Sequence, residues 1–277
     1  MARNREFVQV DVFGARPFKG NPVAVIFDGD GLSVAEMQDI ARWTQLSETT
    51  FVVTPALDGA HYRLRIFTPA SELPFAGHPT LGAAHAWAQH TGFDGESIVQ
   101  ECGAGLVEVR GVDGGYSFSA PPTIRSGPLS AADLAQHVAA LRIDPDAVVA
   151  HQWVDNGPGF AAIELVSAAE VIALEPDFST FPAARVGVIG AHPAGHRAAF
   201  EIRSFVPGLG VPEDPITGSL NAGVAQWFAR EGKVSGEYRV TQGGNIGHDG
   251  ELVIRIDGQS VWVGGATTSL IAGTILT

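Results

Sequence analysis

The strongest constraint on the fold is an internal repeat. The run Arg65–Pro69 followed by Gly77–Ala84 resembles the run Arg203–Pro207 followed by Gly218–Ala225. In each copy an apolar extended run ends in a loop with proline, and a glycine and a polar residue then open an alanine-rich helix. The two glycines lie 141 residues apart in a chain of 277. Two copies of one plan predict two duplicated domains rather than a solenoid.

In both copies of the repeat, a helix begins directly after a loop. The first amides of a helix lack intrahelical partners, and the helix dipole adds positive potential, so helix N-termini attract anions. We therefore expect a site for a small anion in the cleft between the two halves.

Composition excludes several classes of partner. Hydrophobic residues make up 45% of the chain and charged ones 17%, as in a compact globular protein. A net charge of −13 with 17 basic residues argues against nucleic acid or an anionic membrane as partner. The N-terminal residues lack the apolar core of a signal peptide, and no apolar run of about 18 residues follows. The chain is expected to be soluble and cytoplasmic.

Cofactor chemistry also finds little support in the sequence. Cys102 is the single cysteine, which excludes an internal disulfide, a CxxC metal site and a two-thiol acid/base pair. Lys19 and Lys233 both lie in turn-like contexts, so a buried lysine for pyridoxal phosphate is improbable. His192 and His196 are separated by a proline and a glycine that deny them a helical metal-binding spacing. No dinucleotide, P-loop or nucleophile-elbow motif occurs, and we expect neither a metal nor an organic cofactor.

The expected elements mix strands and helices in both halves, which predicts an α+β fold. The Pro-, Ser- and Gly-rich segment 121–128 is the best boundary. We expect one domain over residues 1–120, possibly completed by a C-terminal strand over 266–277, and a second over 121–265. A capping box at Ser33 and Glu36 predicts a helix start, and the tail predicts separate strands over 251–256, 261–264 and 273–276.

Glu48 is the first candidate for chemistry. It lies where a β-branched and aromatic strand, Thr49–Val53, is expected to begin. Partial desolvation there would raise the pKa of the carboxyl toward neutrality, which suits a general base that must also return its proton. The alternative is an exposed glutamate at a helix–strand junction.

His78 and Ser219 occupy matching places in the two repeats, directly after the helix-opening glycines. Histidine can donate and accept protons near neutral pH, although His78 could simply cap its helix, and serine is a common N-cap. Asp214 lies four residues before Gly218. The alternative to a functional role for Asp214 is a purely structural Asx turn. If the two helix ends face each other, His78 and Asp214 would flank an anion held by amides near Gly77 and Gly218, and Glu48 could act on an adjacent carbon.

At these residues the chain resembles the phenazine-biosynthesis PhzF-like family, whose fold is that of diaminopimelate epimerase. The likeness spans nearly the whole chain. The matching stretches are Asp11–Phe13, Pro17–Val25, Leu46–Val52, Phe67–Pro69, Glu72–Gly82, Asn156–Pro158 and Glu213–Ser219.

The resemblance implies two pseudo-symmetric domains, each a mixed sheet wrapped around a central helix, and usually a homodimer. It implies cofactor-free isomerisation in which Glu48 removes a proton from carbon and returns it elsewhere on the substrate. His78 and Asp214 match positions that line the substrate, and with Glu48 they form the expected catalytic set. The substrate-binding set implied with them is Asn21, Ser47, Gly77, Gly218 and Ser219.

Two departures from the family pattern bear on the substrate. The chain has Gly247–Gly250 where a Gly-Arg-Pro-Ser turn is frequent, and Gly159 where phenazine enzymes tend to have a basic residue. Fewer basic groups near the cleft would change which anion fits, so we expect a substrate other than dihydro-hydroxyanthranilate.

These observations predict an isomerase or epimerase that shifts a proton on a small carboxylate-bearing metabolite. One rival is a non-catalytic small-anion binding protein or sensor that uses the same cleft. Another is an acyl-transfer hydrolase using Ser219, which lacks a motif-level base beside it.

Overall fold

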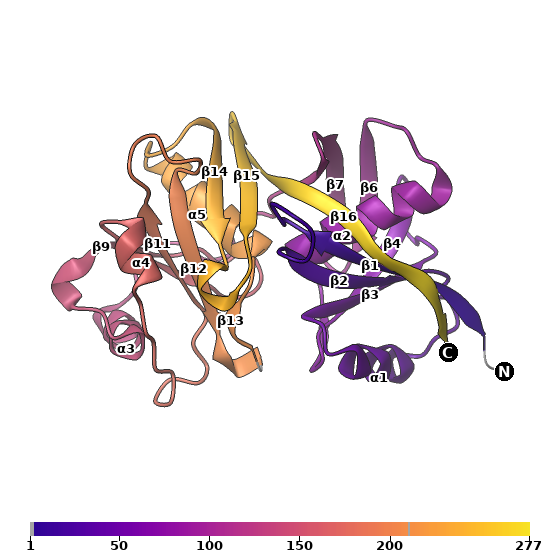
Figure 1. Ribbon diagram of the computed structural model, residues 1–277, viewed down its shortest axis with the longest axis horizontal. Helices are drawn as coiled ribbons and strands as arrows, with labels where there is room; N and C mark the ends of the chain where they lie inside the picture. The colour runs from indigo at the N-terminus through magenta and orange to yellow at the C-terminus, as the bar shows by residue number, and fades with distance from the viewer. Residues whose placement is uncertain (1–2, 210) are drawn as a thin grey trace. The chain divides into compact units, whose positions relative to one another are not determined.

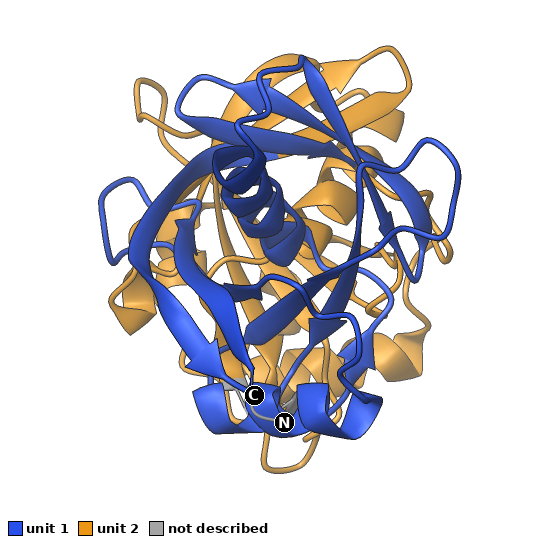
Figure 2. Ribbon diagram, turned by 90° about the vertical axis from the view of Figure 1, so that its right-hand side faces the viewer, with its two compact units in different colours: residues 1–119, 264–277 blue, residues 120–263 orange. Residues whose placement is uncertain are grey.

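The structure is a computed structural model that describes residues 3–209 and 211–277. The chain divides into two compact units (Figure 2). Unit 1 comprises Met1–Ser119 and Gly264–Thr277, and unit 2 comprises Ala120–Val263. The last strand begins in unit 2 and continues into unit 1.

Unit 1 is a mixed sheet with two helices (Figure 1). Its elements are β1 Asn4–Val12, β2 Asn21–Ile26, α1 Val34–Thr44, β3 Glu48–Val53, β4 Tyr62–Phe67, β5 Glu72–Leu73, α2 Gly77–Thr91, β6 Ser97–Cys102, β7 Gly105–Val112, β8 Gly115–Ser119 and most of β16 Ser260–Leu276.

The strands of unit 1 close into a ring around α2. The order is β1-β2-β3-β4-β6-β7-β8-β16, and β16 pairs back onto β1. Helix α2 packs against β1 to β4 and β6 to β8, and Figure 2 shows a helix running through the middle of the ring. Gly82 makes this packing possible, because a Cβ there would lie 2.3 Å from Cγ1 of Val23.

Unit 2 repeats the plan of a mixed sheet with a buried helix. Its elements are α3 Ala131–Leu141, η1 Pro145–Ala147, β9 Val148–Trp153, β10 Ala161–Leu165, α4 Ala168–Ile172, β11 Val186–Ala191, β12 Phe200–Val206, η2 Pro207–Leu209, β13 Val211–Asp214, α5 Gly218–Arg230, β14 Gly236–Gln242, η3 Gly244–Ile246 and β15 Gly250–Asp257. The strand order is β15-β14-β12-β11-β10-β9, and β13 pairs with β12.

Helix α5 is the counterpart of α2. It is buried along most of its length, including Trp227 and Phe228. Gly223 lies 141 positions after Gly82, and a Cβ there would lie 2.3 Å from the carbonyl oxygen of Val154. The sequence repeat is therefore a repeat of structure, and the predicted α+β class is confirmed.

Two local predictions need correction. The tail was expected to form separate strands over 261–264 and 273–276, but β16 is a single strand of 17 residues. The second concerns α1, where the sequence predicts an apolar helical stripe of Val34, Met37, Ile40, Ala41 and Trp43. Met37 and Ala41 are buried, whereas Trp43 is 81% exposed.

Candidate active site

The structure brings Glu48 and His78 together within unit 1. Glu48 is the first residue of β3 and pairs in parallel register with Val23 of β2. His78 is the second residue of α2. Nε2 of His78 lies 3.1 Å from Oε2 of Glu48, and the two side chains are 6% and 14% exposed. A largely buried carboxyl and imidazole in contact can share or exchange a proton.

Burial decides the charge of His78. Desolvation lowers its pKa from 6.5 to about 3, while a hydrogen bond with the backbone of Pro22 acts in the opposite direction. Proline has no N–H, so the imidazole must donate this bond to the Pro22 carbonyl. A neutral ring that donates through one nitrogen presents a lone pair at the other. Since Nε2 faces Glu48, we assign the proton to Nδ1 and the lone pair to Nε2.

The other predicted residues of unit 1 lie on the same elements. Asn21 begins β2 and is fully buried, Ser47 directly precedes β3, and Gly77 opens α2. The N-cap of α2 is Ala76, which makes no side-chain capping bond. The first-turn amides of α2 are therefore not used by a side-chain cap.

In unit 2 the predicted residues cluster at the start of α5. Asp214 ends β13, and Gly218 and Ser219 are the first two residues of the helix. The N-cap is Thr217, whose hydroxyl donates to Oδ2 of Asp214 instead of capping the helix. Ser219 is thus inside the helix rather than at its cap, and its carbonyl accepts a bond from Asn156 Nδ2 at 2.9 Å. The N-terminus of α5, like that of α2, has no side-chain cap.

Sequence reasoning missed Gln242, which holds this region in place. The side chain of Gln242 is buried. Its Oε1 accepts from the Thr217 amide at 3.1 Å and from Asn221 Nδ2 at 3.0 Å. Its Nε2 donates to the Asp214 carbonyl at 3.1 Å and to Thr217 Oγ1 at 3.0 Å. The full hydrogen-bonding capacity of the amide is used. The only sequence signal was a glutamine before two glycines at a strand end.

Comparison with known proteins identifies the family. The chain matches the phenazine biosynthesis-like protein family over residues 10–273. It belongs to that family. It is 37% identical to antisense-enhancing sequence 1 of Schizosaccharomyces pombe over 96% of this chain and 97% of the relative. It is 35% identical to the trans-2,3-dihydro-3-hydroxyanthranilate isomerase of Pseudomonas chlororaphis over 98% and 99% of the two chains.

A solved structure supports the same assignment. The crystal structure of a PhzF family phenazine biosynthesis protein from Enterococcus faecalis superposes with a TM-score of 0.82 at 27% identity, covering 99% of both chains. The expected resemblance to this family is confirmed, and its relatives identify the chain as an isomerase.

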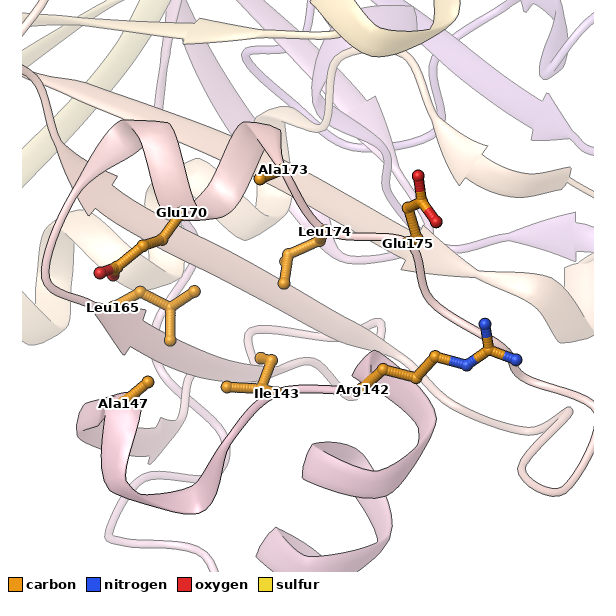
Figure 3. Close-up of a pocket in the computed structure, with 8 residues that line it drawn as sticks. All are labelled: Arg142, Ile143, Ala147, Leu165, Glu170, Ala173, Leu174 and Glu175. Carbon is orange, nitrogen blue, oxygen red and sulfur yellow. The ribbon is translucent and has the colours of Figure 1, made fainter.

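A separate cavity of about 460 Å³ lies in unit 2 (Figure 3). None of the predicted site residues lines it. Two of its three charged residues have structural partners, since Arg142 pairs with Asp177 and Glu170 caps α4. The lining residues are Arg142, Ile143, Ala147, Leu165, Glu170, Ala173, Leu174 and Glu175. No carboxyl–imidazole pair like Glu48 and His78 lines this cavity.

The surroundings of the other reactive side chains do not indicate catalysis or metal binding. Burial raises the pKa of the Cys102 thiol, which keeps it protonated. His192 and His196 stack with ring centroids 3.7 Å apart. Within residues 3–209 and 211–277, no group of three His, Cys, Asp or Glu side chains is placed to hold a metal ion.

No helix in the part of the chain that the structure describes is long and apolar enough to cross a membrane.

Proposed function

We propose that this isomerase shifts a proton on a small carboxylate-bearing, amino-acid-like metabolite without a metal or organic cofactor. Glu48 is the proton carrier. Its carboxylate removes a proton from a substrate carbon, and the resulting carboxylic acid returns that proton to another carbon, so atoms and charge balance. The contact between Glu48 and the neutral ring of His78 is the observation that supports this assignment.

His78 acts as a hydrogen-bond acceptor in this proposal. A neutral imidazole whose Nδ1–H is held by Pro22 can accept the O–H of protonated Glu48 at Nε2. This bond would hold the carboxylic acid in one orientation while it carries the proton. With a pKa of about 3, His78 does not compete with Glu48 as the proton store near neutral pH.

The remaining residues are proposed to bind the substrate. The amides at Gly77 and at Gly218–Ser219 begin helices without side-chain caps, so they can receive a carboxylate. Asn21, Ser47 and Asp214 would contact the polar groups of the metabolite. A related isomerase is named for trans-2,3-dihydro-3-hydroxyanthranilate. The two departures from the family pattern, at Gly159 and at Gly247–Gly250, favour a different substrate for this chain.

The test is deuterium exchange in D2O, followed by NMR, with wild type and a Glu48→Gln variant. The panel contains small conjugated and amino carboxylates, including trans-2,3-dihydro-3-hydroxyanthranilate. We expect deuterium at carbon with wild type and a loss of at least about 100-fold with Glu48→Gln, the range typical of removing a general acid/base. Glu96→Gln is the matched control, because Glu96 is an exposed glutamate outside the proposed site.

Exchange at the wild-type rate by Glu48→Gln would remove Glu48 from the mechanism. A compound that binds wild type without any exchange at carbon would instead support the binding or sensor function. Serine-directed inhibition of turnover would support the hydrolase that uses Ser219.

A further inference from the structure

Thr217 lies in the short connection between β13 and α5 (Figure 1). It is buried, and its side chain makes no capping bond to the helix that follows. Its hydroxyl instead donates to Oδ2 of Asp214 and accepts a hydrogen bond from Nε2 of Gln242 at 3.0 Å. The hydroxyl of Thr217 is therefore placed between a buried amide side chain and a residue of the expected catalytic set.

The backbone fixes the direction of the hydroxyl proton. The Thr217 amide can only donate, and it donates to the side chain of Gln242 at 3.1 Å, so the atom that faces it is the oxygen Oε1. Nε2 of Gln242 then donates to the Asp214 carbonyl at 3.1 Å and to Thr217 Oγ1. Because this nitrogen cannot accept, the hydroxyl proton is directed at Oδ2 of Asp214.

The repeat shows that a helix of this kind begins without such a hydroxyl. At the spacing of 141 residues, Thr217 corresponds to Ala76, which is the N-cap of α2, and Asp214 corresponds to Leu73. Helix α2 therefore starts with neither a hydroxyl nor a carboxyl at these two positions. The start of α5 does not depend on the Thr217 hydroxyl as a cap either, since the hydroxyl makes no capping bond. The contact between Thr217 and Asp214 is thus an addition of unit 2 to the shared plan.

We infer that Thr217 is a positioning residue whose hydroxyl orients the carboxylate of Asp214, with the direction of its proton set by Gln242. The inference rests on the proposed function, in which Asp214 contacts polar groups of the metabolite. A hydrogen bond donated to a carboxylate favours its ionised form and restricts its rotation. An ionised Asp214 accepts hydrogen bonds from a substrate N–H or O–H and donates none.

Carbon-13 NMR of the Asp214 carboxyl, assigned with Asp214→Asn, tests the inference without a substrate. Thr217→Val keeps the branched shape but removes the hydroxyl, so it should raise the pKa of Asp214 by about 1 or more, the effect of losing a bond to a charged group. Thr217→Ser keeps the hydroxyl and should keep the wild-type titration. Thr80→Val is the matched control, because it removes from unit 1 a buried hydroxyl that accepts from Nε2 of Gln100 at 3.0 Å.

Turnover gives a second readout, once circular dichroism has shown that each variant is folded. For a carboxylate that wild type converts, Thr217→Val should lower kcat/KM by about 10-fold or more, and Thr217→Ser should restore most of it. An unchanged pKa of Asp214 in Thr217→Val would overturn the inference. Equal changes in Thr217→Val and Thr217→Ser, or in Thr80→Val, would overturn it as well.

The two readouts separate this inference from the proposed function. A chain that converts no carboxylate, but in which Thr217→Val alone raises the pKa of Asp214, would support the positioning of Asp214 by Thr217 and count against the proposed proton shift. A chain that converts a carboxylate at the same rate in wild type and Thr217→Val, with the same pKa of Asp214, would support the proton shift and refute the role of Thr217.

Discussion

Each unit carries one arginine–glutamate pair at the same point of the repeat, and the two pairs differ mainly in burial. In unit 1, Arg65 Nε and Nη2 donate to Glu72 at 2.8 and 2.7 Å. In unit 2, Arg203 donates to Glu213 with the same two atoms at 2.9 and 2.7 Å. The side chains are 20% and 37% exposed in the first pair and 6% and 8% in the second. The two units therefore allow the same arginine–glutamate ion pair to be compared in a partly exposed and in a buried environment.

Replacing the glutamate by glutamine should have unequal effects on the free energy of unfolding. Glu213→Gln leaves the Arg203 guanidinium buried without its counter-charge, and breaking such a pair typically costs about 3 kcal/mol or more. Arg203 also donates to the carbonyls of Val171 and Leu174 at the end of α4, so the loss should stay near the lower end of that range. Glu72→Gln breaks a partly exposed pair that water can replace, at a cost below about 1 kcal/mol.

Urea unfolding followed by circular dichroism and tryptophan fluorescence measures both variants. Because the two units can unfold in separate transitions, each change is read from the transition of its own unit. Arg203→Met with Glu213→Leu completes the comparison, since replacing both charges by apolar groups should recover part of the loss. Equal destabilisation by Glu213→Gln and Glu72→Gln, within about 0.5 kcal/mol, would refute the assignment of the difference to burial.

Two further predictions concern the helix starts and the helix packing. His78 has a pKa near 3 in the folded chain and 6.5 when unfolded, so the unfolded state binds more protons between these values and stability falls as pH falls. Wild type should therefore lose about 2 kcal/mol more than His78→Gln between pH 7 and pH 5 in urea titrations, and parallel pH profiles would contradict a neutral, buried His78. Gly82→Ala should cost about 1–3 kcal/mol because its Cβ meets the Val23 side chain, and Gly223→Ala should cost more because it meets the Val154 backbone. Thermal unfolding decides the order, with Gly111→Ala as a nearly neutral control that has open space around its Cβ, and the reverse order would contradict this account of the packing.

Local sequence signals predicted the structure correctly where a particular residue type is required by a helix cap or by a left-handed backbone conformation. The capping box at Ser33 and Glu36 forms at the start of α1, and Gly92 takes the left-handed conformation that ends α2. The internal repeat predicted two similar units because the spacing between its two copies can be read directly from the sequence. Arg65 and Arg203 were visible in the repeat, but their pairing with glutamates depends on strand register that no spacing reveals.

The sequence was less informative where tertiary context decides. The sequence predicts that a strand ends at Gly264, yet this glycine lets β16 approach β8 closely and continue, since a Cβ at Gly264 would lie 2.8 Å from Cβ of Ser117. Helical periodicity placed Trp43 on the apolar stripe, yet Ala41 packs in the core with Phe51 while Trp43 is 81% exposed, and spacing alone does not separate the two. Gln242 could not be ranked from sequence because its importance lies in four partners from three other residues.

Strand register also shows where the two halves diverge. Thr49 pairs with Phe67 in unit 1, and Val186 pairs with Phe205 in unit 2, so the residue before each is Glu48 in one half and Arg185 in the other. The duplicated scaffold thus carries a carboxylate at this position once. Inversion at a carbon by two bases needs a second proton carrier on the opposite face of the substrate, whereas a shift by one base takes and returns the proton on the same face. Arg185 at the matched position has only N–H donors and no acceptor atom, so it offers no base there. At this matched position the repeat therefore supplies one proton carrier, Glu48, which agrees with its proposed role.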